Sequence, residues 1–156
     1  MNRIGMLPAS IGKGLVAGFA GTAAMTVSST LEARLRGRQA SSAPARATAK
    51  VLGIKEFDGP LAQARFNDIS HWGYGTGWGI VRGLLAAAGL KPRAATAAHG
   101  AAIYGAAQVT LPALEVVPPA IFWGAKEIAI DAFHHAVYAA ATGLAYQLIE
   151  RRNGAG

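Results

Sequence analysis

The chain lacks cysteine and carries few charged side chains. None of its 156 residues is cysteine, which excludes disulfides, thiolate catalysis, and zinc or iron–sulfur sites held by cysteine. Charged residues make up 15% of the sequence, whereas soluble domains carry about 25%. Hydrophobic residues reach 52%. A small soluble domain must cover a large surface with polar groups, so this shortage indicates a protein whose surface faces lipid.

Acidic residues are also scarce. Eight Asp and Glu stand against fifteen Lys and Arg, which gives a net charge of +7. On a soluble chain this excess would suggest nucleic-acid binding. The basic residues instead cluster between apolar stretches, at 34–38, 91–93 and 151–152. Such clusters are typical of the flanks of membrane spans, where they face anionic headgroups. We therefore predict membrane lipids, and no nucleic acid, as partners.

Four windows have the length and apolar content of a membrane span, which takes about 20 residues. They cover residues 11–31, 69–90, 94–114 and 128–149. We predict an all-α integral membrane protein, in which residues 1–156 form a single domain and a bundle of about four transmembrane helices. The first window could instead be a signal peptide, since Arg3 and Lys13 accompany its apolar run. It continues beyond signal-peptide length, however, and three more windows follow.

A long basic loop, residues 32–68, joins the first two windows. Within it, residues 45–54 place apolar and basic side chains on different sides, which predicts a short amphipathic helix at the membrane interface. Gly59 and Pro60 are expected to end that segment. The arginine cluster at 34–38 favours a cytoplasmic position for this loop. These features describe a multi-pass protein of the inner (plasma) membrane.

Small residues recur at four-residue spacing within the windows. Small side chains on one helical face let membrane helices approach closely, whereas a glycine inside a soluble helix costs up to about 1 kcal/mol relative to alanine. We predict that these residues pack against other helices, within the bundle, in a homo-oligomer or in a membrane-protein partner. They are Gly14 and Gly18 in the first window, Gly75, Gly79 and Gly83 in the second, and Ala101 and Gly105 in the third.

Polar side chains gather where four-span connectivity brings four window ends to one face. They are Glu32, Asp68, His71, Glu115, Glu127, Asp131, His134 and His135. One interpretation is a rim of solvated helix ends, with Asn67 or Asp68 as an N-cap and Glu127 favoured by the helix dipole. The alternative is a site that binds a metal, a proton or a lipid headgroup.

The spacing in the fourth window gives the site hypothesis its residues. Glu127, Asp131 and either His134 or His135 follow at i, i+4 and i+7 or i+8, and they share one helical face. We prefer His135, because its spacing of four from Asp131 matches a one-face pair, although a spacing of three also allows contact. Ionisable side chains within a span are costly and face the protein interior. Carboxylates and imidazoles on facing helices also resemble the metal sites of helical bundles. A divalent metal would then be held by His71, Asp131 and His135, with Glu32, Glu127 and His134 nearby. No other cofactor is predicted.

No catalytic residue emerges from the sequence. Ser28 and Ser29 have no base at a fixed spacing, and there is no Gly-x-Ser-x-Gly elbow. Arg82 is the other costly residue within a window. We expect it to snorkel towards the Lys91 side or to pair across the bundle.

Three segments carry a resemblance to a known group of proteins. They are Gly18–Thr26 (GFAGTAAMT), His71–Gly75 (HWGYG) and His134–Tyr138 (HHAVY). Together they resemble small uncharacterised bacterial membrane proteins of the YagU-like domain-of-unknown-function group. The resemblance implies a multi-span bacterial inner-membrane protein and a link to acid tolerance, and it supplies no catalytic residues.

These observations predict a non-catalytic accessory or structural membrane component that packs against partners or itself. The first alternative is a metal-binding or proton-handling protein that uses the polar cluster. The second is a membrane enzyme that acts on lipid.

Overall fold

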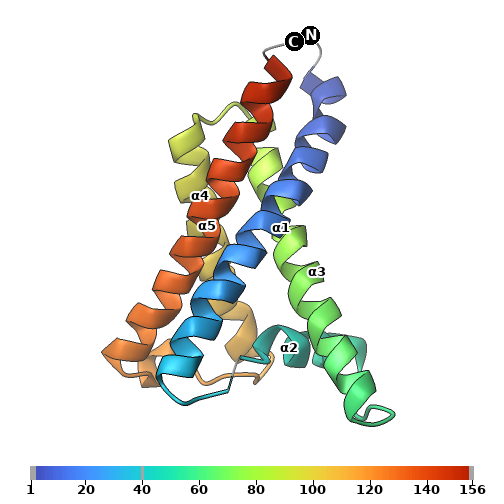
Figure 1. Cartoon of the computed structure of the whole chain (residues 1–156), viewed down its shortest axis with the longest axis vertical. Helices are drawn as coiled ribbons and strands as arrows, with labels where there is room; N and C mark the ends of the chain where they lie inside the picture. Colours follow the sequence, from blue (N-terminus) through green and yellow to red (C-terminus); the bar gives the residue numbers. More distant parts are fainter. Residues whose placement is uncertain (1–2, 40, 155–156) are drawn as a thin grey trace.

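Four long helices and one short helix account for most of the chain (Figure 1). The computed structural model describes residues 3–39 and 41–154, and within them every regular element is helical, as the sequence predicts. The elements are α1 (Arg3–Leu35), α2 (Ala43–Leu52), α3 (Pro60–Ala87), α4 (Pro92–Ala113), the 3₁₀ helix η1 (Ala120–Phe122) and α5 (Ala125–Gly154).

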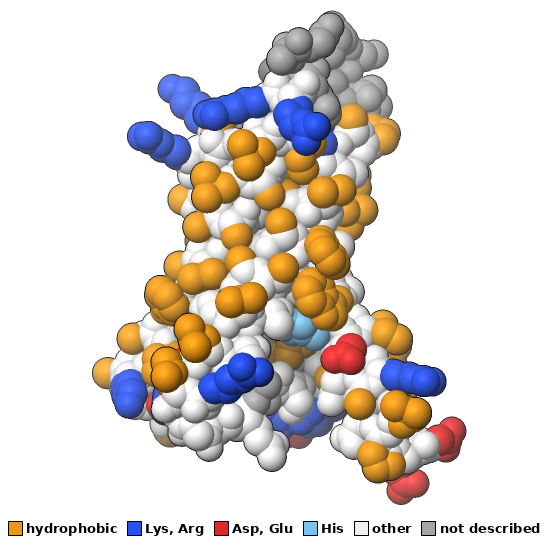
Figure 2. Space-filling model, viewed as in Figure 1, with side chains coloured by type: hydrophobic (Ala, Val, Ile, Leu, Met, Phe, Trp, Pro, Cys, Tyr) orange, Lys and Arg blue, Asp and Glu red, His pale blue; other side chains and the backbone are white. Residues whose placement is uncertain are grey.

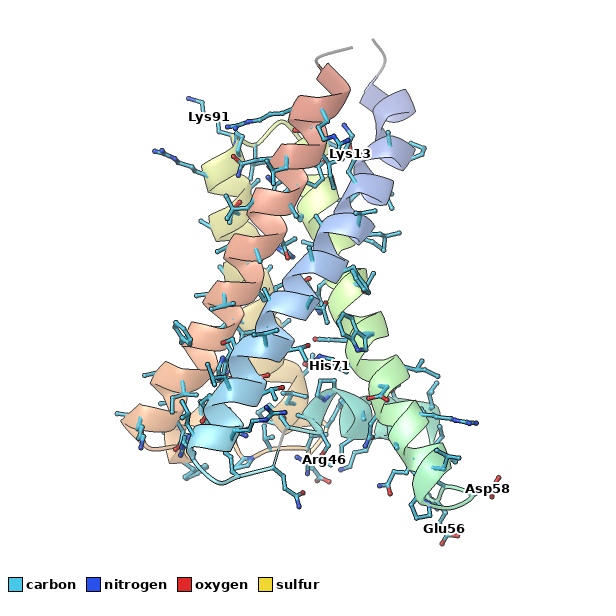
Figure 3. All side chains as sticks on the ribbon, in the orientation of Figure 1. Lys13, Arg46, Glu56, Asp58, His71 and Lys91 are labelled. Atoms are coloured by element: carbon cyan, nitrogen blue, oxygen red, sulfur yellow. The ribbon has the colours of Figure 1, made fainter. Side chains whose placement is uncertain are left out.

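The long helices form a bundle in which α1 packs against both α3 and α5, and α5 packs against α4. The start of α1 and the end of α5 lie at the same end of the bundle, together with the link from α3 to α4 (Figure 1). This end carries Lys13 and Lys91 (Figure 3), and we refer to it as the basic end. The opposite end, which we call the loop end, holds α2 and the link from α4 to α5 (Figure 1).

The segment between α1 and α3 differs from the prediction. Pro60 begins α3 instead of ending the preceding segment, because proline's fixed φ suits the first turn of a helix and its missing N–H is not needed there. Asn67 and Asp68 therefore lie inside α3 and cap nothing, and Gly59 is the N-cap residue. The predicted loop, residues 32–68, is shorter than expected, and its residue 40 lies outside the described residues.

The expected short helix is present as α2, shifted two residues towards the N-terminus. Its apolar side chains divide between Ala43 and Ala45, which are buried, and Val51 and Leu52, which are exposed. The helix ends at Gly53, whose left-handed φ of 68° is readily adopted by glycine. The Gly53 N–H donates to the Lys50 carbonyl at 3.3 Å and so closes the last turn. Because α2 packs against α3, it tethers the loop end of the bundle.

The contact between α1 and α3 is built from glycines. A Cβ atom added to Gly79 would lie 2.8 Å from the Gly18 Cα and closer still to the Gly14 carbonyl oxygen. A Cβ added to Gly18 would lie 2.6 Å from the Thr76 carbonyl oxygen. Gly75 and Gly83 extend this contact in both directions along α3. The absence of side chains is therefore what allows the two backbones to meet.

The predicted small face of α4 does not take part in this packing. Gly105 has no described atom within 4 Å of an added Cβ, and Ala101 is exposed. The α4–α5 contact uses other small residues: a Cβ on Gly100 would meet the Ala139 side chain at 3.0 Å, and Gly143 faces Thr96. Spacing alone does not fix which side of α4 turns inward.

Large apolar side chains lie mainly on the outside of the bundle. Val27 on α1 and Val109 on α4 are each 69% exposed, and Leu148 on α5 is 59% exposed. Figure 2 shows hydrophobic side chains along the middle of the long helices and Lys and Arg at the basic end. The buried hydrophobic residues of the described chain are mostly alanines. This distribution is the reverse of a water-soluble core.

One described helix is both long and apolar enough to cross a membrane, namely α1 over Leu7–Leu35. The sequence analysis assigned four such windows. Length does not separate them: α4 has 22 residues, which reach about 33 Å at about 1.5 Å per residue, against about 30 Å of hydrocarbon. What differs is composition, because polar side chains such as Arg82 in α3, Gln108 in α4 and Asp131 in α5 interrupt the apolar runs of those helices.

Candidate functional site

Two of the predicted site carboxylates at the loop end, Glu32 and Glu127, accept hydrogen bonds from arginine side chains. Arg36 bridges α1 and α5 by donating to Glu32, at 2.9 Å, and to both carboxylate oxygens of Glu127. Arg38 also donates to Glu32. The hydrogen bonds from Arg36 hold the pKa of the Glu127 carboxyl below its ordinary value. These carboxylates therefore link helices and are not left open as ligands.

The other acidic residues of the predicted cluster are likewise separated. Glu115 follows α4 and pairs with Lys50 of α2 at 3.2 Å, where it is largely exposed. Asp68 lies on the exposed side of α3. An exposed ion pair of this kind contributes about 0–1 kcal/mol. Neither residue contributes to a shared site.

His71 faces α1. Its Nε2 lies 2.8 Å from the Thr26 hydroxyl. Because Thr26 donates its own proton to the Thr22 carbonyl at 2.7 Å, the hydroxyl is the acceptor and His71 the donor. Figure 3 shows His71 between α1 and α3, in the half of the bundle nearer the loop end. This histidine joins two helices.

Asp131 and His135 face α4 instead. Gln108 donates to the Asp131 Oδ2 at 2.9 Å, and His135 Nδ1 donates to the Asp131 backbone carbonyl at 2.9 Å. The His135 ring also packs edge-on against Tyr104, with centroids 5.3 Å apart. Both side chains thus line the outer α4–α5 contact.

The structure does not bring His71 together with Asp131 and His135. Among residues 3–39 and 41–154, no three His, Asp or Glu side chains are placed to share a metal ion. The reason is rotational: His71 turns towards α1, whereas Asp131 and His135 turn towards α4. The three-residue metal hypothesis therefore has no geometric support in the described part of the chain.

The buried histidine of α5 is His134 and not the predicted His135. His134 is 5% exposed, and its Nδ1 lies 2.6 Å from the Ser28 hydroxyl on α1. Its Nε2 lies 3.7 Å from a carboxylate oxygen of Glu32. The hydroxyl and the imidazole are within hydrogen-bond distance, which suits a nucleophile and its base, whereas Nε2 has no hydrogen-bond partner and Glu32 is only a nearby charge. The sequence offers no base for Ser28, because 106 positions separate it from His134.

A second polar group occupies the centre of the bundle. It comprises Arg82 of α3, His99 of α4, and Tyr138, Thr142 and Tyr146 of α5, and we call it the central polar cluster. Each of these residues is at most 1% exposed. The three α5 residues follow at intervals of four, so they form one stripe along that helix. That spacing is the signal that sequence reasoning left unused.

Hydrogen bonds tie part of the central polar cluster to α3. The Tyr138 hydroxyl donates to the Gly75 carbonyl at 2.6 Å, and His99 Nε2 donates to the Trp78 carbonyl at 3.0 Å. The Arg82 guanidinium carbon lies 4.3 Å from the centre of the Tyr146 ring, within the range of a cation–π contact. Arg82 therefore crosses the bundle to α5 and does not snorkel to the Lys91 side.

Several polar atoms of the cluster have no partner among the described atoms. They are Nε and Nη1 of Arg82, Nδ1 of His99, Oγ1 of Thr142 and the hydroxyl of Tyr146. Buried polar atoms are usually hydrogen-bonded, because leaving one unpaired costs about 1–3 kcal/mol. Their concentration at the junction of α3, α4 and α5 marks this position as a candidate binding site.

A shallow groove of about 380 Å³ runs along the α4–α5 contact. Its walls are mainly alanine and glycine, and its polar side chains are Thr96, Tyr104 and His135. The exposed Ala101 lies on one wall.

Comparisons of the chain with models of protein families, with curated proteins and with solved structures find no match.

Proposed function

We propose that the protein is a small four-span membrane protein that acts without catalysis, as an accessory or structural component. The observation that carries the proposal is the reversed distribution of side chains. Large apolar side chains such as Val27, Val109 and Leu148 point outward, whereas Arg82 and His99 are buried. Water would disfavour such a surface, but the lipid interior favours it.

The burial of α1 supports the same placement. The core helix of a soluble protein is mostly buried, but 28% of the apolar α1 window is buried in the bundle. The other long helices share its environment because their exposed faces carry residues such as Leu84, Val109 and Leu144. Basic residues at the end that holds Lys13 and Lys91 would meet anionic headgroups. The kinship with YagU-like proteins of bacterial inner membranes is part of this proposal.

The α4–α5 groove supports assembly with a membrane-protein partner or a second copy. Its alanine and glycine walls would let another helix approach closely, because small residues permit backbone contact in lipid. Ala101, which lines the groove, is exposed, and a Cβ added to Gly105, one helical turn further along α4, would meet no described atom within 4 Å. These two residues follow the predicted four-residue spacing, and they would pack against a helix from the partner or the second copy.

Topology reporters test the span count. Fusions of alkaline phosphatase or green fluorescent protein after Arg38, after Lys91 and after Arg152 should report two different sides. With four spans, the sites after Lys91 and Arg152 share one side, and the site after Arg38 lies on the other. We expect the Arg38 site on the cytoplasmic side, where phosphatase is inactive. Identical signals from Arg38 and Lys91 would remove the four-span arrangement.

The contact between Ser28 and His134 favours a second candidate, a membrane enzyme that cleaves lipid esters. Ser28 Oγ would attack the ester carbonyl while His134 Nδ1, 2.6 Å away, takes its proton. The bond from the carbonyl carbon to the alcohol oxygen then breaks, and the imidazolium returns the proton to that alcohol. Water hydrolyses the acyl-serine by the same route. Glu32, 3.7 Å from Nε2, would stabilise the imidazolium.

A fluorophosphonate probe separates this candidate from the non-catalytic proposal. An activated serine reacts with the probe and a hydrogen-bonding serine does not. If the protein is an enzyme, the wild type and Ser29→Ala are labelled, whereas Ser28→Ala is not. Ser29 is a matched control because it donates to the Thr26 carbonyl at 3.3 Å, within its own helix. An unlabelled wild type would show that Ser28 and His134 simply join α1 to α5.

A further inference from the structure

We propose that the bundle binds a phosphate group or a similar oxyanion at Arg82, in the half nearer the basic end. The site would consist of the Arg82 guanidinium and the Tyr146 hydroxyl. This inference goes beyond the proposed function. It rests on buried atoms and charge, and it holds whether or not the number of spans is four.

The first step concerns the charge of Arg82. Its guanidinium stays protonated in proteins, and the residue is 1% exposed. None of the ion pairs among the described residues includes it. Its Nε and Nη1 have no hydrogen-bond acceptor among the described atoms. A buried charge is normally paired, since desolvation is otherwise uncompensated, so an anionic partner is expected.

The second step concerns the surroundings of the guanidinium. The Tyr146 ring lies against it, with the guanidinium carbon 4.3 Å from the ring centre, and the Tyr146 hydroxyl is itself unpartnered. On α4, His99 uses Nε2 to donate to the Trp78 carbonyl, which lies one helical turn before Arg82. Its Nδ1 has no described partner, but because Nε2 carries the ring proton, Nδ1 is an acceptor and does not donate to the anion. Three helices thus contribute polar atoms to one buried region.

The third step concerns the sign of the charge at this end. The described residues 7–16, 82–96 and 146–152 include Lys13, Lys91, Arg93, Arg151 and Arg152 in addition to Arg82. The one acidic residue among them is Glu150, which pairs with Lys13 at 3.5 Å. Figure 2 shows Lys and Arg side chains at this end and also at the loop end, where Asp and Glu side chains accompany them. The field at the basic end attracts anions.

The chemistry of arginine selects the class of anion. A guanidinium presents parallel N–H groups that match two oxygens of a phosphate. A chloride ion is a single atom and cannot accept from both N–H groups in this way. Such a phosphate has two sources, free inorganic phosphate or the headgroup of an anionic lipid. Both would meet the same atoms, and they differ in whether the phosphate arrives alone or with its acyl chains.

The test measures ligand-dependent stability of the full chain purified in a neutral detergent. One arm adds inorganic phosphate against chloride at equal ionic strength. The other adds vesicles of phosphatidylglycerol against vesicles of phosphatidylcholine. We expect one of the two phosphate probes to raise the unfolding temperature of the wild type. A response to inorganic phosphate identifies a free oxyanion as sufficient, and a response to phosphatidylglycerol alone identifies the lipid headgroup.

Variants locate the effect. Arg82→Gln should lower the affinity for the phosphate probe at least about tenfold, because hydrogen bonds to charged groups contribute that much affinity. The rise in unfolding temperature should then require a correspondingly higher concentration of the probe. Arg93→Gln removes one charge from the same end and should leave the response close to wild type. Tyr146→Phe keeps the ring but removes the hydroxyl, and it should weaken the response less than Arg82→Gln. If Arg82→Gln does not fold, Tyr146→Phe still tests the proposal.

Two results would overturn the proposal. One is a wild type that responds to neither inorganic phosphate nor phosphatidylglycerol. The other is a response that survives in both Arg82→Gln and Tyr146→Phe, since binding would then take place at the exposed basic residues. Both arms use protein outside a native membrane, so either result leaves the reporter test of the proposed function unaffected.

Discussion

Replacing Gly79 by leucine is expected to lower the free energy of unfolding by about 3 kcal/mol, the upper part of the range for overpacked sites. Even a single added Cβ would lie 2.8 Å from the Gly18 Cα and 2.9 Å from the Gly14 carbonyl carbon. These are backbone atoms on another helix, so no side chain can rotate away. Relief requires α1 and α3 to separate. Thermal unfolding of the detergent-purified chain measures the loss.

Gly77→Leu is the matched control. It lies on the same helix, two residues earlier, and an added Cβ there meets no described atom within 4 Å. It makes the same change in side chain and in helix propensity. Equal unfolding temperatures for the two variants would mean that the glycines of α3 do not hold α1, contrary to the structure.

Replacing Tyr138 by alanine is expected to cost about 3–5 kcal/mol, the usual range for truncating a buried aromatic side chain. Tyr138 is 1% exposed, and its ring packs beside His99 with centroids 5.5 Å apart. It also lies where Gly21 of α1 approaches α5. Truncation would therefore open a cavity where three helices meet.

A second variant separates the ring of Tyr138 from its hydroxyl. Tyr138→Phe keeps the packing but loses the 2.6 Å hydrogen bond to the Gly75 carbonyl, at a cost of about 0.5–1.5 kcal/mol. Tyr104→Ala is the control, because Tyr104 is only partly buried beside His135 in the α4–α5 groove. If Tyr104→Ala destabilises the chain as much as Tyr138→Ala, the central position of Tyr138 does not account for its contribution.

The sequence alone located the long helices well. The third window, residues 94–114, is α4 at Pro92–Ala113, and the fourth falls within α5. Local composition decides such segments because a continuous apolar run with few breakers has no competing structure. The prediction is wrong at Gly59 and Pro60, which do not end the preceding segment but begin α3. Proline suits a helix start as well as a stop, so only the fold decided between them.

Glycine spacing likewise identified the contact face of α3. Gly75, Gly79 and Gly83 lie at the α1 contact, as do Gly14 and Gly18 on α1. Four-residue spacing is a property of one helix and can be read without its neighbour. On α4 the same spacing does not mark a contact within the bundle, because Ala101 and Gly105 face away from it. A face of small residues permits close packing, but it does not determine which helix packs against it.

The polar residues show what only the tertiary structure decided. Successive residues of a helix point about 100° apart, so a modest rotation of α5 determines whether His134 or His135 is buried. That rotation is set by contacts remote in sequence, among them Gly21 against Tyr138 and Gly143 against Thr96. The sequence determined that ionisable residues lie within the helices. Packing determined that His134 meets Ser28 and that Arg82 is buried against Tyr146.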